Sequence, residues 1–464
     1  MTDTVNAVIK EPPSTGLYSA HQKVYPREVQ GRFNRLRTIS VVALLGLFYL
    51  LPWVRWDGRQ AVLFDLPARK FYVFGLTFFP QDFFLLTWLL IIAALSLFFF
   101  TALAGRLWCG YACPQTVWTE VFVWMERWTE GNRQQRMKLD RGPWNAGKLA
   151  RKSAKQFLWI AFSLYTGFTF VGYFTPIHVL AGELGTLSLG GWEWFWMLFY
   201  GFATYGNAGY MREQVCKYMC PYARFQSAMF DRNTLIISYD AARGEPRGSR
   251  PRAVDPRSRN LGDCIDCKLC VQVCPTGIDI RKGLQLECIA CAACIDACDD
   301  VMDKMQYPRG LIRYSTQAAM DGEKTRIVRP RTLIYGTALL ALIVGFFIAV
   351  SQRTLIEVDV LRDRNALYRR LDNGEIENVY TIRIINKDTS AHRVRLHVEG
   401  LDDARLDTDD EVVVVDAESI ASIVARIQAP AETKGGRDIE IVATALDDSS
   451  FESRAEARFI APAQ

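Results

Sequence analysis

The sequence predicts a membrane protein built from an α-helical bundle, an inserted cysteine-rich segment and a small C-terminal β-sandwich. Three observations support this fold class. Half of the 464 residues are apolar, and long apolar stretches recur through the first half of the chain and again near residue 340. All twelve cysteines lie between residues 109 and 298. Beyond residue 353, apolar and polar side chains alternate, which is typical of strands with one buried face.

Five apolar stretches predict transmembrane helices, each of which needs about 20 residues to cross a bilayer. They cover residues 38–54, 82–104, 157–175, 192–210 and 332–350. The first is short, but Trp53 and Trp56 at its end suit an interfacial aromatic belt. Residues 71–79 are also apolar, yet so short a helix rises only ~13 Å. We expect that segment to be an interfacial or re-entrant lead-in, which leaves a bundle of five helices.

The distribution of charge predicts the orientation in the membrane. The N-terminal segment, the loop after the second span and the segment before the fifth are rich in Lys and Arg, whereas the loop after the third span has none. Positive loops stay in the cytoplasm, so we expect a multi-pass protein of the cell inner membrane, with a cytoplasmic N-terminus and a periplasmic C-terminal domain. Arg55, Arg59, Arg69 and Lys70 in the first outer loop oppose this orientation.

The net charge of +5 is small for the length of the chain and lies mostly beside apolar segments. It therefore indicates membrane orientation and argues against a nucleic-acid partner. The first residues are polar and basic and lack the pattern of a cleavable signal peptide, so the first apolar stretch is expected to remain as an anchor.

These signals predict five parts along the chain. They are a cytoplasmic basic segment (1–37), a four-helix membrane domain with two C-x-x-x-C-P motifs (38–210), a cytoplasmic basic linker with a ferredoxin-type domain (211–331), a fifth transmembrane helix (332–350) and a periplasmic β-sandwich (353–464). Strands of the sandwich are expected at residues 377–387, 392–400, 411–417, 419–429, 438–446 and 451–460. The basic linker is either a solvated tether or an attachment to anionic lipid head groups.

Eight cysteines follow the spacing of bacterial ferredoxins, C-x2-C-x2-C-x3-C, in two consecutive runs. The runs are Cys264, Cys267, Cys270 and Cys274, and then Cys288, Cys291, Cys294 and Cys298. In two-cluster ferredoxins the fourth cysteine of each run ligates the other cluster. The spacing therefore predicts two [4Fe–4S] clusters, one held by Cys264, Cys267, Cys270 and Cys298 and the other by Cys288, Cys291, Cys294 and Cys274. Zinc also binds C-x2-C pairs, but two complete runs favour iron–sulfur clusters and the relay of single electrons.

Two further cysteine pairs share the motif C-x-x-x-C-P, each after an apolar stretch. They are Cys109 and Cys113 before Pro114, and Cys216 and Cys220 before Pro221. Residues i and i+4 of a helix share a face, so each pair is expected to present two sulfurs together. Each proline suits the first position of a new helix. That position near a helix N-terminus, together with the nearby positive charge of Arg106, Arg212 and Lys217, predicts lowered thiol pKa values for Cys113 and Cys220.

Paired soft thiolates of this kind suit Cu(I), an exchangeable disulfide or a further metal centre. The alternative is four buried structural thiols. His178 is the only histidine in the predicted outer loops, and it is either a haem or metal ligand or a structural residue. The sequence carries no nucleotide-binding loop, nucleophile elbow or H-E-x-x-H motif that would indicate a hydrolase. These residues by themselves predict a membrane-anchored electron relay.

Several segments outside the ferredoxin runs carry a resemblance to a known family. They are residues 24–27 (V-Y-P-R), 56–61 (W-D-G-R-Q-A), 69–76 (R-K-F-Y-V-F-G-L), 105–119 (G-R-L-W-C-G-Y-A-C-P-Q-T-V-W-T) and 216–221 (C-K-Y-M-C-P). Over nearly its whole length the chain resembles the FixG/RdxA/CcoG family of cytochrome c oxidase accessory proteins.

The resemblance implies an immunoglobulin-like fold for the C-terminal sandwich. It also implies a role in the assembly of cbb(3)-type cytochrome c oxidase, through reduction of Cu(II) to Cu(I). The cysteines of the family's C-x-x-x-C-P motifs correspond to Cys109, Cys113, Cys216 and Cys220.

Three functions remain as alternatives. The first is a cupric reductase, in which electrons from a cytoplasmic donor pass through the clusters to copper at the paired thiols. The second is a quinol- or ferredoxin-linked electron carrier for another respiratory enzyme. The third is a copper chaperone or assembly scaffold. The partners expected are the membrane, an electron donor, and copper chaperones or oxidase assembly factors, while the sequence leaves a homo-oligomer open.

Overall fold

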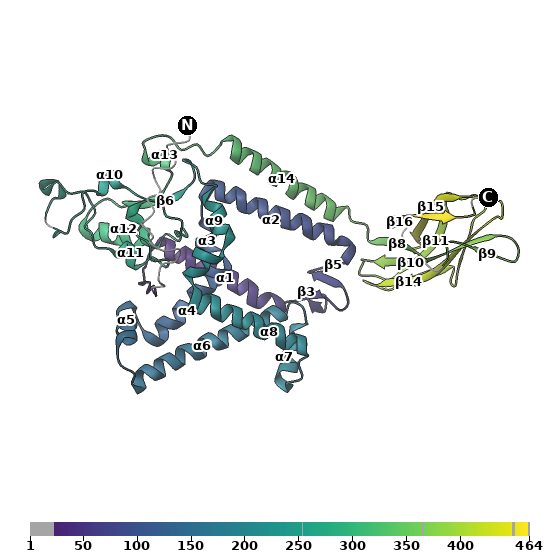
Figure 1. Cartoon of the computed structure of the whole chain (residues 1–464), viewed down its shortest axis with the longest axis horizontal. Coiled ribbons are helices and arrows are strands. Elements are labelled where there is room, and N and C mark those ends of the chain that lie inside the picture. Colours follow the sequence, from purple (N-terminus) through teal and green to yellow (C-terminus); the bar gives the residue numbers. More distant parts are fainter. Residues whose placement is uncertain (1–22, 253, 364–365, 448–450, 463–464) are drawn as a thin grey trace. The chain divides into compact units, whose positions relative to one another are not determined.

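The computed structural model describes residues 23–252, 254–363, 366–447 and 451–462. The chain divides into two compact units, whose elements are labelled in Figure 1. One unit contains Met1–Leu63 and Trp88–Ile343, and the other contains Phe64–Thr87 and Val344–Gln464. All twelve cysteines belong to the first unit, and none of them forms a disulfide.

Three helices of the described residues are long and apolar enough to cross a membrane, which identifies a membrane protein. They are α1 (Arg32–Leu50, followed by the 3-10 turn Leu51–Trp53), α2 (Phe83–Ala104, preceded by the 3-10 turn Pro80–Asp82) and α14 (Pro330–Ser351). These helices coincide with the first, second and fifth predicted spans.

The third and fourth predicted spans are helical, but they do not meet the same criteria. Helix α6 (Ala146–Val171) carries four basic residues in its first half, and α8 (Gly191–Thr204) is short and continues as the π-helical turn η3 (Tyr205–Met211). The count of five membrane helices is therefore not confirmed. The two helices pack side by side, and a Cβ on Gly167 or Gly201 would meet the backbone of the opposite helix (Figure 1).

The apolar residues 71–79 form strands, so the predicted lead-in is not helical. β4 (Lys70–Val73) pairs with β5 (Leu76–Phe78) in an antiparallel hairpin, with β3 (Val62–Asp65) on the other side of β4. Before them, β1 (Arg55–Trp56) pairs with β2 (Arg59–Gln60). The hairpin leads into α2 through Asp82, whose carboxylate accepts a hydrogen bond from the backbone N–H of Phe79 at 3.1 Å.

Short helices complete the helical part of the first unit. They are α3 (Leu107–Tyr111), α4 (Pro114–Glu130), α5 (Arg133–Arg141), α7 (Ile177–Thr186), the π-helical turn η4 (Val215–Met219) and α9 (Pro221–Ser227). Their core joins α1, α4 and α6 through Val41, Val121, Phe122 and Trp159, all of which are buried. This packing fixes α4, and with it the motif at its start.

The ferredoxin-type segment is closed at its two ends by a pair of short strands. β6 (Ile236–Tyr239) runs antiparallel to β7 (Ile312–Ser315), with Ile236 opposite Ser315. Between them lie α10 (Ala241–Gly244), η5 (Pro256–Arg259), α11 (Leu269–Gln272), η6 (Ile280–Lys282) and α12 (Ala293–Met305), and α13 (Gln317–Met320) follows. The cysteines lie on the loops before α11 and α12 and on these two helices.

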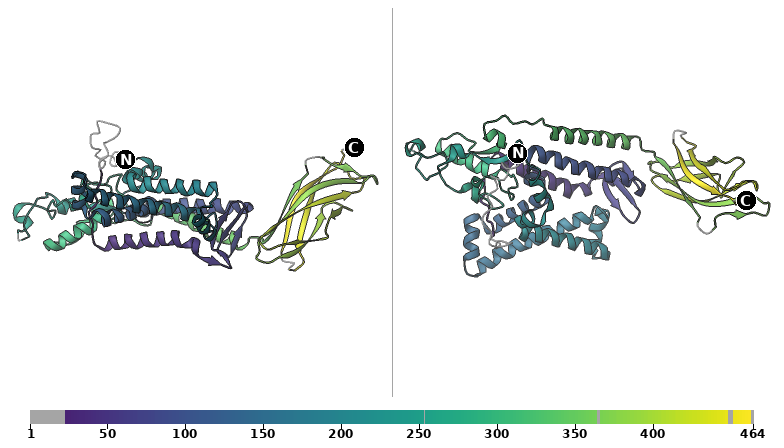
Figure 2. Two further views of the ribbon diagram at one scale, coloured as in Figure 1. Left: turned by 90° about the horizontal axis from the view of Figure 1, so that it is seen from below. Right: turned by 45° about the horizontal axis from the view of Figure 1, so that its top comes forward.

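The second unit contains a sandwich of two antiparallel sheets, seen from two further directions in Figure 2. One sheet has the order β12 (Arg405–Thr408), β14 (Ile420–Ala429), β10 (Ile376–Asn386) and β8 (Ile356–Arg362), with β9 (Arg369–Arg370) also on β10. The other has the order β13 (Val412–Val415), β11 (His392–Glu399), β15 (Gly436–Ala445) and β16 (Glu452–Ile460). All six expected strands are present, and β8, β9 and β12 are additional.

Candidate metal centres

The first candidate centre is a cavity lined by Cys264, Cys267, Cys270 and Cys298. Three of these cysteines come from the first run, and the fourth comes from helix α12. The remaining lining is largely apolar and includes Tyr239, Leu269, Val301 and Leu311. The structure therefore brings together the four thiols that the ferredoxin spacing assigned to one cluster.

The second candidate centre is a neighbouring cavity lined by Cys274, Cys288, Cys291 and Cys294. The rest of its lining consists mainly of isoleucine side chains, those of Ile237, Ile278, Ile280 and Ile289. Cys270 lines both cavities, so the two centres adjoin. Burial raises the pKa of Cys288 to about 12, so without a metal its thiol is protonated at neutral pH.

The same backbone conformation recurs in both runs and explains how three closely spaced sulfurs face one cavity. Asp266 and Lys268 flank the middle cysteine of the first run, and both have positive φ angles of 53° and 57°. Ala290 and Ala292 flank the middle cysteine of the second run, with φ angles of 53° and 60°. Left-handed backbone costs a non-glycine residue roughly 1–2 kcal/mol. Because both runs adopt this unfavourable backbone conformation at matching positions, the same loop shape is required in both.

The donor set fits [4Fe–4S] clusters. Each cavity offers at least four thiols and mostly apolar walls, which is the environment that cubane clusters use. Within the described ranges, no three His, Cys, Asp or Glu side chains converge in a way that suits a single metal ion. The thiolates of a cubane cluster surround a group of several atoms and not a single ion. Their side chains are therefore expected to line a cavity, as they do here, without converging on one point.

The third candidate centre combines both C-x-x-x-C-P motifs. Cys109 lies on α3 and Cys216 on η4, while Cys113 and Cys220 are the residues directly before α4 and α9. Cys109 is close enough to interact electrostatically with Cys113, Cys216 and Cys220, and Cys113 with Cys220. Two pairs that are far apart in sequence therefore form one group, which we call the four-thiol site.

The two motifs differ locally from the expected helical pairs. Pro114 and Pro221 do occupy first helical positions, as predicted. However, Cys113 and Cys220 have extended backbones, with ψ angles of 127° and 110°. The sulfurs of each pair therefore do not share the face of one continuous helix, because the chain breaks directly before each proline.

The expectation of a lowered thiol pKa directly before each proline was wrong for Cys113. Burial raises the pKa of Cys109 to about 12 and that of Cys216 to about 11, and it also raises the pKa of Cys113. Arg106 lowers the pKa of Cys109 and Cys216, but burial has the larger effect. The Arg106 guanidinium donates to the backbone carbonyls of Leu286 and Ala223, and Arg212 forms an ion pair with Glu126 at 3.2 Å.

The four-thiol site packs directly against the second candidate centre. Cys109 contacts the apolar cluster that contains Ile289, Cys291 and Cys294. Gly110 allows this approach, since a Cβ there would lie 2.8 Å from the carbonyl oxygen of Ile289. The guanidinium of Arg106 binds carbonyls on both sides of the contact. The structure thus forms one continuous series of three cysteine groups.

A buried carboxylate that the sequence analysis did not single out supports the loop before Cys216. Glu126 is fully buried and forms ion pairs with Arg136 at 2.9 Å, Arg212 at 3.2 Å and Lys23 at 3.6 Å. Burial by itself would raise the pKa of Glu126, but the neighbouring cations outweigh it and lower the pKa. Arg212 has a left-handed backbone, with a φ of 42°, and its side chain lies over the Trp159 ring at 5.4 Å. The ion pair with Glu126 holds the side chain in this position.

His178 has a packing contact in the structure. Its ring lies edge-on to Trp53, with centroids 5.3 Å apart. No group of three ligating side chains in the described part of the chain includes it.

Comparison with known proteins gives three relatives that span most of the chain. Nitrogen fixation protein FixG of Rhizobium meliloti is 38% identical over 436 residues, which cover 86% of this chain and 83% of that protein. Protein RdxB and protein RdxA of Cereibacter sphaeroides are 42% and 41% identical, and each match covers more than four fifths of both chains. The chain belongs to the FixG/RdxA family.

Matches to domain families agree with the three parts of this FixG-family chain. Residues 211–317 match a 4Fe-4S dicluster domain, residues 85–132 match a 4Fe-4S binding domain, and residues 346–462 match the Ig-like fold at the C-terminus of FixG. The chain is accordingly a FixG-like iron–sulfur redox protein of the electron-transfer type, with an immunoglobulin-like C-terminal domain. The match over residues 85–132 includes Cys109 and Cys113, so an iron–sulfur family description also extends to part of the four-thiol site.

Proposed function

We propose that this FixG-family protein reduces Cu(II) to Cu(I) at the four-thiol site and thereby supports the assembly of a cbb(3)-type cytochrome c oxidase. The observation that supports this proposal is the contact between the site and the second ferredoxin-type cavity. Thiolates prefer Cu(I), so pairs of thiols beside an electron relay suit the reduction of copper. Within the described residues no three of these thiols converge on one point, so the proposal needs only two of them to bind each copper ion.

The electron balance requires one electron for each copper ion. A one-electron donor such as reduced ferredoxin supplies it, and the [4Fe–4S] clusters, when bound, relay it without changing the electron count. Copper accepts the electron and changes from Cu(II) to Cu(I). Because metal ligands must be deprotonated, the buried thiols release their protons as copper binds.

The residues between the centres keep them close. Gly110 allows the backbone of the first motif to contact the loop of Ile289, as described above. The hydroxyl of Thr116 donates to the carbonyl oxygen of Cys109 at 2.6 Å, which joins the first motif to helix α4. Arg106 holds the start of the motif against the second run.

We further propose the orientation that the charge distribution predicts, with the N-terminus and the clusters in the cytoplasm and the Ig-like domain in the periplasm of an inner membrane. The partners are then a cytoplasmic electron donor and copper chaperones or oxidase assembly factors. Accessibility of single introduced cysteines or tags on the two sides of the membrane tests the orientation.

An anaerobic assay with a chromophore specific for Cu(I) tests the reductase. Cys109→Ser and Cys216→Ser are each expected to abolish Cu(I) formation while leaving the electron paramagnetic resonance signals of the two ferredoxin-type clusters intact. Met219→Leu changes an exposed neighbour of Cys220 without removing a thiol, and it is the matched control. Undiminished Cu(I) formation in both cysteine variants would refute the proposal.

A second candidate function is supported by the family match that includes Cys109 and Cys113. In this alternative the four thiols hold a third iron–sulfur cluster, and the protein carries electrons to another respiratory enzyme. Counting iron per chain separates the two functions: a carrier contains the iron of three clusters and loses one third of it in Cys216→Ser, whereas a reductase contains the iron of two clusters and loses none.

A further inference from the structure

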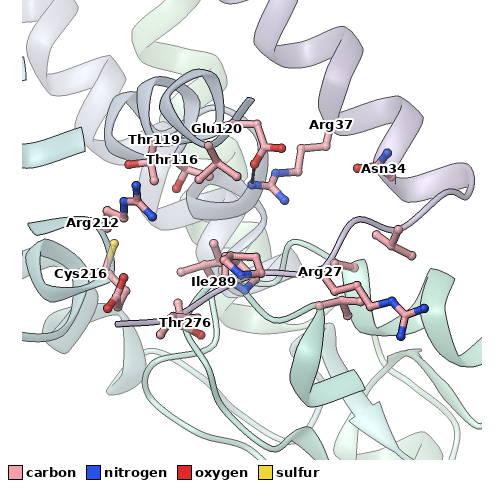
Figure 3. A pocket seen from close by; sticks show the side chains of 18 of the residues that line it. Arg27, Asn34, Arg37, Thr116, Thr119, Glu120, Arg212, Cys216, Thr276 and Ile289 are labelled. Carbon is pink, nitrogen blue, oxygen red and sulfur yellow. Dashed lines mark hydrogen bonds and ion pairs between the residues drawn. The ribbon is translucent and has the colours of Figure 1, made fainter. Parts of the chain in front are cut away.

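Two cavities of the first unit meet and lead to Cys216. The outer cavity has a volume of about 730 Å³, which is in the range of small-ligand sites. The inner cavity has a volume of about 60 Å³, enough for several water molecules. Arg27, Asn34 and Arg127 line both, so the two cavities adjoin. Cys216 and Arg212 lie at the far end of the inner cavity from Arg27 (Figure 3).

The walls of this route are rich in arginine. The outer cavity contains Arg27, Arg127, Arg133 and Arg136 and one acid, Glu28. The inner cavity adds Arg37 and Arg212 and two acids, Glu120 and Glu213. Arginines therefore outnumber acids six to three along the combined lining.

Some of these arginines are neutralised by their own partners. Arg37 pairs with one oxygen of Glu120 at 2.5 Å, and the indole N–H of Trp124 donates to the other oxygen at 2.9 Å. Arg136 and Arg212 share Glu126, which lies outside both linings. The Arg37–Glu120 pair adds no net charge to the walls, whereas Arg136 and Arg212 together carry one more positive charge than Glu126 balances.

Three other arginines lack an acidic partner or share one within the described residues. Arg27 has no hydrogen bond or ion pair through its side chain there, and the side chain of Arg133 donates to the backbone carbonyl of Tyr25 at 2.9 Å. Arg127 lies 3.8 Å from Glu120, whose oxygens are already engaged, and its Nε is buried with no hydrogen-bond partner in the described part of the chain. Arg27 and Arg127 stand where the two cavities meet.

We propose that this route admits anions to the four-thiol site. A cleft lined by one sign of charge with apolar walls concentrates ligands of the opposite sign and can raise their association rate by about 10–1,000-fold. A free divalent copper ion would be repelled at Arg27 and Arg127. The inference rests on the proposed function for its substrate: copper arrives at Cys216 as a complex of net negative charge, carried by carboxylate or thiolate ligands, and not as a hydrated cation.

Thiol-modifying reagents of opposite charge test the route without copper and without electron transfer. A methanethiosulfonate reagent is attacked by the thiol sulfur of Cys216, which forms a mixed disulfide and releases a sulfinate. Rates at Cys216 are measured by mass spectrometry on the full chain in copper-free, anaerobic membranes. The rates of a sulfonate-bearing and a trimethylammonium-bearing reagent are each divided by their rates with free cysteine.

The anionic reagent is expected to react about 10-fold faster than the cationic one after this correction. Arg27→Gln and Arg127→Gln should each reduce the preference several-fold, and 1 M salt should largely remove it, because the screening length is then only about 3 Å. Arg35→Gln removes an exposed arginine of α1 that lines neither cavity, and it should leave the preference unchanged.

Equal rates for the two reagents, or a preference for the cation, would overturn the proposal. So would failure of every reagent to reach Cys216, since the route would then be closed. A chain that prefers the anion but forms no Cu(I) in the chromophore assay would keep the route and lose the reductase, so the two failures are distinguishable.

Discussion

Replacing Glu126 by glutamine tests how the buried charges hold the loop that carries Cys216. In the parent protein the buried carboxylate forms ion pairs with Arg136, Arg212 and Lys23 and reduces the repulsion among them. Glutamine has nearly the same shape but no charge, so Glu126→Gln leaves these cations facing one another. Arg212 then loses the partner that stabilises its unusual backbone, four residues before Cys216.

The magnitude follows from the burial of the pair. Arg136 and Glu126 have side chains only 1% and 0% exposed, so solvent cannot screen the cations that remain. Removing one partner of such a buried pair typically costs about 3–5 kcal/mol. Asp300→Asn is the matched control, since Asp300 and Lys304 form an ion pair with side chains 53% and 71% exposed. Exposed pairs of this kind contribute between roughly 0 and 1 kcal/mol.

Hydrogen exchange measures the effect locally, which suits a chain with two units better than a single unfolding temperature. A loss of about 3 kcal/mol corresponds to faster exchange by a factor of roughly 100. We expect this increase in peptides that cover residues 133–141 and 205–220 of Glu126→Gln, with no change in Asp300→Asn. Unchanged exchange in both peptides of the Glu126 variant would show that the ion pairs do not hold the loop.

Three further predictions address other parts of the molecule. Gly110→Val should displace the first motif from the loop of Ile289 and slow Cu(I) formation at least about 10-fold while the iron content stays constant; a variant as fast as the parent would contradict the role of this contact. Asp82→Asn should lower the stability of the second unit by about 2 kcal/mol, measured by denaturant unfolding of its sheets, because Lys387, 3% exposed, loses one of its two carboxylate partners at 2.7 Å and keeps Glu357; an unchanged midpoint would be inconsistent with a stabilising pair. Burial raises the pKa of Tyr380 to about 12 from an unfolded value near 10, so this side chain stabilises the sandwich fully below about pH 10 and loses that contribution, about 2 kcal/mol at most, as the pH rises to about 12. Tyr380→Phe should flatten the stability profile in this range, and an unaltered pH dependence would exclude Tyr380 as its source.

Local spacing was sufficient to group the eight ferredoxin-type cysteines, because ligand loops are short and each run repeats the same pattern. The structure places Cys298 with the first run and Cys274 with the second, which is the exchange that the spacing indicated. Their role as cluster ligands is a proposal that iron analysis tests. The sandwich strands were also visible in the sequence, since alternation with one buried face depends only on neighbouring residues.

The formation of the four-thiol site could not be predicted from the spacing of cysteines within each motif. The meeting of the two C-x-x-x-C-P motifs depends on the packing of α4 against α6 and on the buried charge of Glu126, and neither leaves a signal beside the cysteines. The same applies to the thiol pKa values. The charge of Arg106 does lower the pKa of Cys109, but the burial of this thiol, which depends on tertiary packing, has the larger effect.

The short pair of β6 and β7 has a consequence for how such a protein can vary. Because Ile236 and Ser315 lie opposite each other on β6 and β7, the ferredoxin-type segment begins and ends at nearly the same point of the first unit. Segments with adjacent ends can be inserted or exchanged with little disturbance to the framework that carries them. The cysteine-rich stretch has the form of an inserted module, and another redox module with closely spaced ends could take its place if it also supplied the contacts to Gly110 and Arg106 beside the two C-x-x-x-C-P motifs.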